Sequence, residues 1–180
     1  MSVSRVVLYG PPLAGKTTIV ETFSRKKGLE LRSIQVPSNH PTIDVPDHAG
    51  IVTETMLAAT RCEVSTIPGG VFGDTPWISL IGNAQAVVVV LDCQADIADL
   101  DRVLQKLDSF PGTHALRCVV LSRADLAPTS VLEQKRSYLR GKLQSREVEL
   151  PLFVTRLDQP ETLVRPIDFL LDKLSSAETT

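Results

Sequence analysis

Residues 10–17 read Gly10-Pro11-Pro12-Leu13-Ala14-Gly15-Lys16-Thr17, and the prediction of the fold starts here. The segment follows an apolar run at residues 6–9 and leads into a helix-compatible segment at residues 18–27. Gly10 and Gly15 let the backbone wrap closely around an anion. Successive backbone N–H groups and the positive end of the following helix dipole point at that anion. The pattern therefore predicts a strand, a phosphate-binding loop and a helix, and it favours nucleotide binding over a chance glycine-lysine turn.

The residues of this loop have separate expected roles. Pro11 and Pro12 have no N–H, so the donors to phosphate must come from the backbone between Leu13 and Thr18. Lys16, the predicted catalytic residue of the loop, should reach the β- and γ-phosphates, and Thr17 should give its hydroxyl to Mg²⁺. The predicted nucleotide-binding residues of the loop are Gly10, Leu13, Ala14, Gly15, Lys16, Thr17 and Thr18.

Length and composition indicate one domain. The chain has 180 residues, of which 43% are hydrophobic, and we expect residues 1–176 to form one core followed by a short polar tail, 177–180. A formal charge of −2 gives no electrostatic case for nucleic acid or an anionic membrane as a partner. With no long apolar run and no lipidation motif, the sequence predicts a cytoplasmic protein without a lipid anchor. Its three cysteines are widely spaced and odd in number, which favours reduced, buried thiols.

Segments typical of strands and helices alternate along the chain. We expect helices at residues 18–27, 95–110 and 130–144, and a last one that Pro166 starts or kinks. Six strands are expected, at residues 6–9, 51–59, 61–67, 86–91, 116–121 and 150–155. The alternation predicts an α/β fold with three layers, in which helices cover both faces of a six-stranded, mostly parallel sheet.

The helix expected at residues 130–144 carries two further predictions. Ser130 and Glu133 form the pattern of a capping box at its start. Its exposed side should carry a basic stripe, which we interpret as a solvated face rather than a docking surface, formed by Lys135, Arg136, Arg140 and Lys142.

After the strand at residues 116–121 comes Ser122-Arg123-Ala124-Asp125, which resembles the NKxD motif that recognises guanine in small Ras-like GTPases. Asp125 can accept both N–H donors of the guanine Watson–Crick edge, and adenine offers no matching pair. Arg123 is expected to lie against the base where the family has lysine. Ser122 is shorter than asparagine and is expected to leave a bond to the phosphate loop unmade. The alternative is an aspartate that caps a helix after a strand.

Other small-GTPase elements follow in the family's order. Pro41-Thr42 is similar to the switch I pair, which implies that Thr42 senses Mg²⁺ and the γ-phosphate as a metal-binding and catalytic residue. Thr66-Ile67-Pro68-Gly69 occupies the place of the DxxG motif, with threonine replacing the aspartate and Gly69 predicted to bind the nucleotide. The base loop is represented by Thr155 and Arg156, also predicted nucleotide-binding residues.

This combination resembles the bacterial MglA subfamily of Ras-like GTPases, which also has threonine at the DxxG position. MglA-type proteins are polarity and motility switches, cycled by a roadblock-fold activator, and they carry no lipid. The resemblance implies the Ras-like fold, binding of GTP and GDP with Mg²⁺, and a regulatory protein at the switch regions.

Two departures from the family affect hydrolysis. Gly70 stands where the family has its water-positioning glutamine, and Pro41 stands where MglA-like proteins carry an arginine. Neither residue can orient water or stabilise negative charge, so we expect slow hydrolysis, or hydrolysis only with a partner that supplies the missing group.

One alternative function is a protein-binding module that holds guanine nucleotide and does not cycle between GTP-bound and GDP-bound states. Another is a P-loop ATPase or kinase, in which Asp125 would have no role.

Overall fold

The computed structural model describes residues 3–35, 49–57, 60–67, 81–108, 115–145 and 150–178. Within them, seven strands form one sheet in the order β2-β3-β4-β1-β5-β6-β7. The strands are β1 (Val3–Tyr9), β2 (Leu31–Gln35), β3 (Ala49–Leu57), β4 (Thr60–Thr66), β5 (Ala86–Asp92), β6 (Leu116–Ser122) and β7 (Leu152–Val154). The helices are α1 (Lys16–Lys27), α3 (Ile97–Asp108), the short 3₁₀ helix η1 (Ala124–Leu126), α4 (Thr129–Gln144) and α5 (Pro160–Glu178).

The sheet is mixed but mostly parallel. Strand β1 pairs in parallel with β4 and β5, and the parallel pairing continues from β5 to β6 and from β6 to β7. The pairs β2–β3 and β3–β4 are antiparallel. All six predicted strands are present, and the prediction of six strands is wrong by one, because β2 extends the sheet beyond β3.

Strand β2 is short and lies at the edge of the sheet. Its five residues pair with the start of β3, with Ser33 opposite Ile51. An edge strand needs no continuous apolar run, because it is not covered on both sides like β5. Residues 36–48, between β2 and β3, lie outside the described residues.

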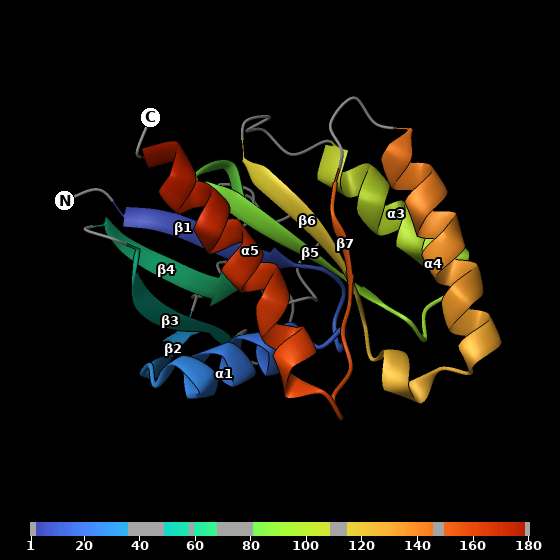
Figure 1. Cartoon of the computed structure of the whole chain (residues 1–180), viewed down its shortest axis with the longest axis horizontal. Coiled ribbons are helices and arrows are strands. Elements are labelled where there is room, and N and C mark those ends of the chain that lie inside the picture. Colours follow the sequence, from blue (N-terminus) through green and yellow to red (C-terminus); the bar gives the residue numbers. More distant parts are fainter. Residues whose placement is uncertain are drawn as a thin grey trace, which may run out of the picture.

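Helices cover both faces of the sheet (Figure 1). Side chains of one face, such as Val88 and Val90, pack with α1 and α5, and side chains of the other face, such as Val89 and Leu91, pack with α3 and α4. Successive side chains of a strand point to opposite faces, so a strand buried on both sides must be apolar throughout. Every residue of β5 is buried, and all of them except the last, Asp92, are apolar, which explains the continuous run of valines.

The helix ends correct two predictions. Pro128 precedes α4, and no side chain of the described residues caps the start of that helix, so the predicted capping box of Ser130 and Glu133 is wrong. Helix α5 begins at Pro160 and continues through Pro166. Proline is favoured at the first position of a helix because the N–H it lacks has no partner there. Pro166 therefore does not start the helix.

The described residues bear on two further expectations. All three cysteines are buried and form no disulfide, as predicted. None of the described helices combines the length and the apolar character that crossing a bilayer requires.

Candidate functional site

The predicted phosphate loop lies between the end of β1 and the start of α1, at the carboxyl end of the parallel strands. This is the edge where open α/β sheets bind ligands. Gly10 packs against β5 so closely that a Cβ at this position would lie 2.1 Å from the Val90 carbonyl oxygen. Gly15 precedes α1 with a φ of 88°, in the left-handed region. Both glycines are therefore required by the path of the loop.

Leu13 also has a positive φ, of 60°, although it is not glycine. A left-handed conformation costs a residue with a Cβ about 1–2 kcal/mol, so this backbone is strained. The Leu13 side chain is 85% exposed and gains little from packing. Strained backbone conformations persist where the surrounding structure enforces them, and they are frequent at ligand-binding loops.

Lys16 is nearly buried at the first turn of α1. Its side chain is folded back over the loop, and the ammonium donates hydrogen bonds to the carbonyl oxygens of Gly10, at 2.9 Å, and Pro11, at 2.7 Å. Burial lowers the pKa of Lys16 to about 8. Both acceptors are neutral, so the positive charge is not cancelled by a carboxylate in these bonds and is available to an anion.

The other predicted loop residues differ in how far they are buried. Ala14 is fully buried, Thr18 is half-buried and Thr17 is exposed. The Thr17 hydroxyl therefore lies where a hydrated cation can reach it. A site made of one hydroxyl and the oxygens of a bound phosphate fits Mg²⁺, which usually keeps several waters. No cluster of three or more His, Cys, Asp or Glu side chains that could hold a metal occurs in the described part of the chain.

Ser122 connects the predicted base-recognition segment, which comprises residues 122–125, to the phosphate loop. Its Oγ lies 2.7 Å from the carbonyl oxygen of Ala14 and 3.0 Å from that of Leu91, and it donates its single proton to one of them at a time. The prediction that the serine is too short to reach the loop is therefore wrong. The β6 strand brings Ser122 close enough that a short side chain makes the contact.

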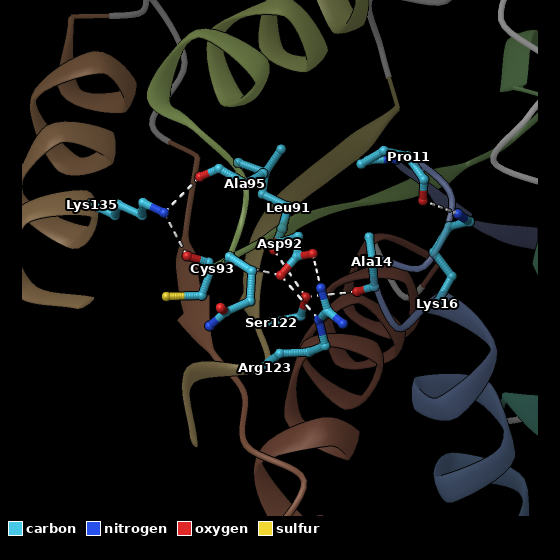
Figure 2. A network of polar contacts seen from close by, with 11 residues as sticks. Pro11, Ala14, Lys16, Leu91, Asp92, Cys93, Ala95, Ser122, Arg123 and Lys135 are labelled. Atoms are coloured by element: carbon cyan, nitrogen blue, oxygen red, sulfur yellow. Dashed lines mark hydrogen bonds and ion pairs between the residues drawn. The ribbon is translucent and has the colours of Figure 1, made fainter. Parts of the chain in front are cut away.

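Arg123 forms an ion pair instead of lying free for the base. Its Nε donates to Oδ1 of Asp92 at 3.0 Å, and a second guanidinium nitrogen contacts Oδ2 of the same carboxylate (Figure 2). The prediction that its planar head lies against the base is not supported by this geometry. Oδ1 of Asp92 also accepts the N–H of Gln94 at 2.8 Å, so Asp92 organises the loop that follows β5.

Asp125 and the predicted base loop lie side by side. Oδ1 of Asp125 accepts the backbone N–H of Leu157 at 2.9 Å. The carbonyl of Thr155 accepts the N–H of Ala124 at 3.1 Å, which joins the two segments a second time. A carboxylate has about four acceptor positions, so this one bond leaves Asp125 able to accept both N–H donors of a guanine edge.

Arg156 is held at the surface beside Asp125. Its guanidinium donates two bonds of 3.0 Å each to the carboxylate of Asp158, and its backbone N–H donates to Oγ1 of Thr162 at 2.9 Å. Thr155 is fully buried, and its hydroxyl has no hydrogen-bond partner among the described atoms. The two predicted base-loop residues thus differ: the side chain of Arg156 is partly exposed and paired with Asp158, and Thr155 is buried and supports the loop through its backbone.

Several predicted residues cannot be placed. Thr42 and Gly69, together with Pro41 and Gly70, lie outside the described residues. Thr66, at the position of the missing aspartate, is described: its Oγ1 accepts the N–H of Ile51 from β3 at 3.0 Å. The hydroxyl therefore serves the pairing of β3 with β4.

Lys135 has a structural role, connecting α4 to the loop after β5, that was not predicted from the sequence. It was predicted on the exposed basic stripe, but it is only 8% exposed. Its ammonium crosses from α4 to the loop after β5 and donates to the carbonyl oxygens of Cys93 and Ala95, both at 2.6 Å (Figure 2). The signal was its spacing: Lys135 lies four residues before the buried Leu139, on the same face of the helix.

Comparisons with known proteins identify the fold. No family model and no curated protein matches this sequence. Among solved structures, a bacterial selenocysteine-specific elongation factor, EF-Sec, aligns with 96% of this chain at 19% identity and a TM-score of 0.58, over 29% of its own length. Elongation factor SelB from Methanococcus maripaludis, in complex with the GTP analogue GPPNHP, aligns with 100% of this chain at 16% identity and a TM-score of 0.56, over 35% of its own length.

These similarities show the fold and nothing finer. The chain has the same fold as the parts of these two elongation factors that align with it, and it spans about a third of the length of either protein. The resemblance to the MglA subfamily stays a prediction.

Proposed function

We propose that this chain is a guanine-nucleotide-binding switch protein that binds GTP and GDP with Mg²⁺. Lys16 would contact the phosphates, Thr17 would contact the metal, and Asp125 would select guanine. The observation that carries the proposal is the bond between Ser122 and Ala14, because it fixes the segment of Asp125 against the phosphate loop within one fold. A ligand that combines an anionic group with a purine fits this pairing of a cationic loop with an acidic segment.

The proposed switch hydrolyses GTP slowly, or only with a partner. Thr42 and the backbone of Gly69 are the proposed sensors of the γ-phosphate, and ordering of their segments by that phosphate is how a GTP-bound state would be read. Gly70 and Pro41 lack side chains that could position water or stabilise charge, which supports dependence on a regulatory protein. From the MglA resemblance we propose a roadblock-fold activator as the class of that partner.

A second candidate function is a module that holds guanine nucleotide without cycling. It is favoured by Thr66, whose hydroxyl is used within the sheet and which offers no carboxylate to the metal region. Single-turnover GTP hydrolysis, measured with and without cell extract, separates the two functions. Hydrolysis that appears only with extract supports the switch, and its absence under both conditions supports the module.

The choice of nucleotide tests the proposal itself. We expect GDP and GTP to displace a fluorescent guanine nucleotide about 100-fold more effectively than ATP, because hydrogen bonds to a charged group contribute about 1.5–3 kcal/mol each. Asp125→Ala should remove most of this preference. Asp172→Ala, which changes an exposed acid on α5, is the matched control and should leave the preference unchanged.

A clear preference for ATP would overturn the proposal and favour the third reading, a P-loop ATPase or kinase. Unchanged selectivity in Asp125→Ala would also contradict it, because the role of Asp125 as the guanine acceptor would then be wrong.

A further inference from the structure

We propose that Asp92 is a positioning residue for nucleotide binding: its ion pair with Arg123 holds the base-recognition segment against the phosphate loop and so sets how long a nucleotide stays bound. The inference rests on the proposed function and deepens it. It assigns Asp92 a role in retaining the ligand although Asp92 need not touch the ligand.

The geometry of the pair is that of a firm contact. The guanidinium of Arg123 meets both carboxylate oxygens of Asp92, with Nε 3.0 Å from Oδ1. The side chains are only 27% exposed in Arg123 and 12% exposed in Asp92. Two parallel bonds fix the orientation of both planar groups. Because the pair is partly buried, removing one partner leaves an uncompensated charge, whereas most exposed pairs can be broken with little effect.

The Asp92 carboxylate belongs to a turn that is held by further hydrogen bonds. Its Oδ1 accepts the N–H of Gln94 at 2.8 Å, which closes the turn that follows β5. Lys135 reaches the same turn from α4 and donates to two of its carbonyl oxygens, those of Cys93 and Ala95 (Figure 2). Asp92 therefore presents its oxygens from a turn that is anchored to another helix.

The phosphate loop lies directly beside this turn. Asp92 lines a cavity of about 340 Å³ together with Pro11, Pro12 and residues of α3. Arg123, the other member of the ion pair, directly follows Ser122. The Oγ of Ser122 is hydrogen-bonded to the carbonyl oxygen of Ala14 in the phosphate loop. The ion pair thus joins the segment that ends in Asp125 to the turn after β5, which lines a cavity together with the phosphate loop.

The polar side chains of residues 122–125 contact three parts of the sheet edge. Ser122 contacts the phosphate loop and the end of β5, Arg123 contacts Asp92 at the end of β5, and Asp125 contacts the loop after β7. Arg123 also has a φ of 56°, in the left-handed region that a residue with a Cβ seldom adopts. Such a conformation persists where the surrounding structure holds it. The ion pair with Asp92 and the backbone bond from Ala124 to Thr155 are both part of those surroundings.

Loss of the ion pair should therefore release nucleotide faster. A bound guanine nucleotide would span the phosphate loop and Asp125, so its affinity depends on the two being held in the correct relative position. A site that is held in its binding geometry loses less entropy on binding, and most changes in affinity within one site appear in the dissociation rate. Breaking the pair frees the segment and should raise that rate.

The test is the dissociation rate of a fluorescent guanine nucleotide, measured by displacement with excess GDP. We expect at least a tenfold faster rate in Asp92→Asn and a smaller increase in Arg123→Lys, which keeps the charge but loses the two parallel bonds. The matched control is Asp101→Asn. Asp101 contacts Tyr138 and Lys142 between α3 and α4 and is 28% exposed. It should lower the midpoint of thermal unfolding and leave the dissociation rate unchanged.

A dissociation rate for Asp92→Asn within twofold of the wild type would overturn the inference, and so would an equal acceleration in Asp101→Asn, which would indicate general loosening. If Asp92→Asn does not fold, the double variant Asp92→Asn with Arg123→Gln removes both charges together and decides in the same way: a tenfold faster rate supports the role, and a wild-type rate overturns it. A wild-type protein that binds no nucleotide would instead refute the proposed function.

Discussion

Lys16 brings a positive charge into a nearly buried position where both of its hydrogen-bond acceptors are backbone carbonyls. The pKa of about 8 shows that burial disfavours the charged form in the free protein. The unfolded chain, with an ordinary pKa of 10.5, holds this proton more tightly between pH 8 and 10.5. In that window Lys16 therefore makes the free energy of unfolding rise with pH.

Nucleotide binding should show the opposite trend with pH. A phosphate ligand needs the charged ammonium, so above pH 8 the free protein must take up a proton before it binds. We expect the dissociation constant for GDP to increase about eightfold between pH 7.5 and 9.0, at constant ionic strength. Fluorescence titration measures it.

Lys16→Arg is the control for this pH dependence. Arginine keeps its charge throughout the range, so this variant should bind more weakly than the wild type but with little change in affinity between the two pH values. It also corrects for any titration of the nucleotide itself. Equal pH dependence in both proteins would show that another group is responsible.

Which side chains of the site could be predicted depends on what each one contacts. Lys16 and Asp125 follow from residue type and position along the chain, because a loop after the first strand and a segment after a central strand meet at one sheet edge. The Ser122 contact with Ala14 and the Arg123 ion pair could not be predicted from the sequence. Each depends on the distance between two segments that are far apart along the chain, and a small change in that distance decides whether the hydrogen bond forms. The Thr66 hydroxyl also serves a partner, Ile51, from another strand.

At the scale of the elements, the structure requires one helix-associated glycine and not another: Gly28 at the end of α1 is required, and Gly141 within α4 is not. Gly28 ends α1 with a φ of 65°, where its N–H closes the last turn on the Ser24 and Arg25 carbonyls. Gly141 lies within α4, and a Cβ there would meet nothing within 4 Å. The first glycine is needed by the backbone, and the second weakens a helix without a steric reason.

Replacing each by alanine should therefore change stability in opposite directions. Gly28→Ala should lower the free energy of unfolding by about 1 kcal/mol, because alanine disfavours the left-handed conformation. Gly141→Ala should raise it by about 0.5–1 kcal/mol, because alanine loses less backbone entropy in a helix. Urea unfolding measures both variants in the absence of nucleotide. A change of the same sign in both would contradict this account of the two glycines.

Elements with strong periodicity were predicted well, and those defined by their neighbours were not. The valine run of β5 and the apolar spacing of α3 are visible in the sequence because each buries a whole face or stripe. Strand β2 has only five residues and exists because β3 offers it a free edge. The burial of Lys135 likewise depends on carbonyls of another element, although its spacing from Leu139 gave a signal.

At the scale of the whole molecule, nucleotide binding at the proposed phosphate loop would stabilise the fold. The loop lies between β1, at the centre of the sheet, and α1, which packs with α5 on one face. A nucleotide that binds the folded chain alone adds RT ln(1 + [L]/Kd) to the free energy of unfolding, which is about 2.7 kcal/mol at 100 times Kd. For a chain of this size, that gain raises the unfolding midpoint by about 5–10 °C.

We therefore expect GDP with Mg²⁺, but not ATP, to raise the midpoint of thermal unfolding by about 5–10 °C at 100 times Kd. Lys16→Ala should abolish this increase. In the absence of nucleotide the same variant should unfold at or above the wild-type temperature, because burial of the Lys16 charge opposes folding until an anion binds, as its lowered pKa indicates. Scanning fluorimetry measures both effects. A lower midpoint for nucleotide-free Lys16→Ala would mean that the two carbonyl contacts stabilise the loop more than burial of the charge destabilises it, and Lys16 would then be a structural residue as well as a ligand-binding one.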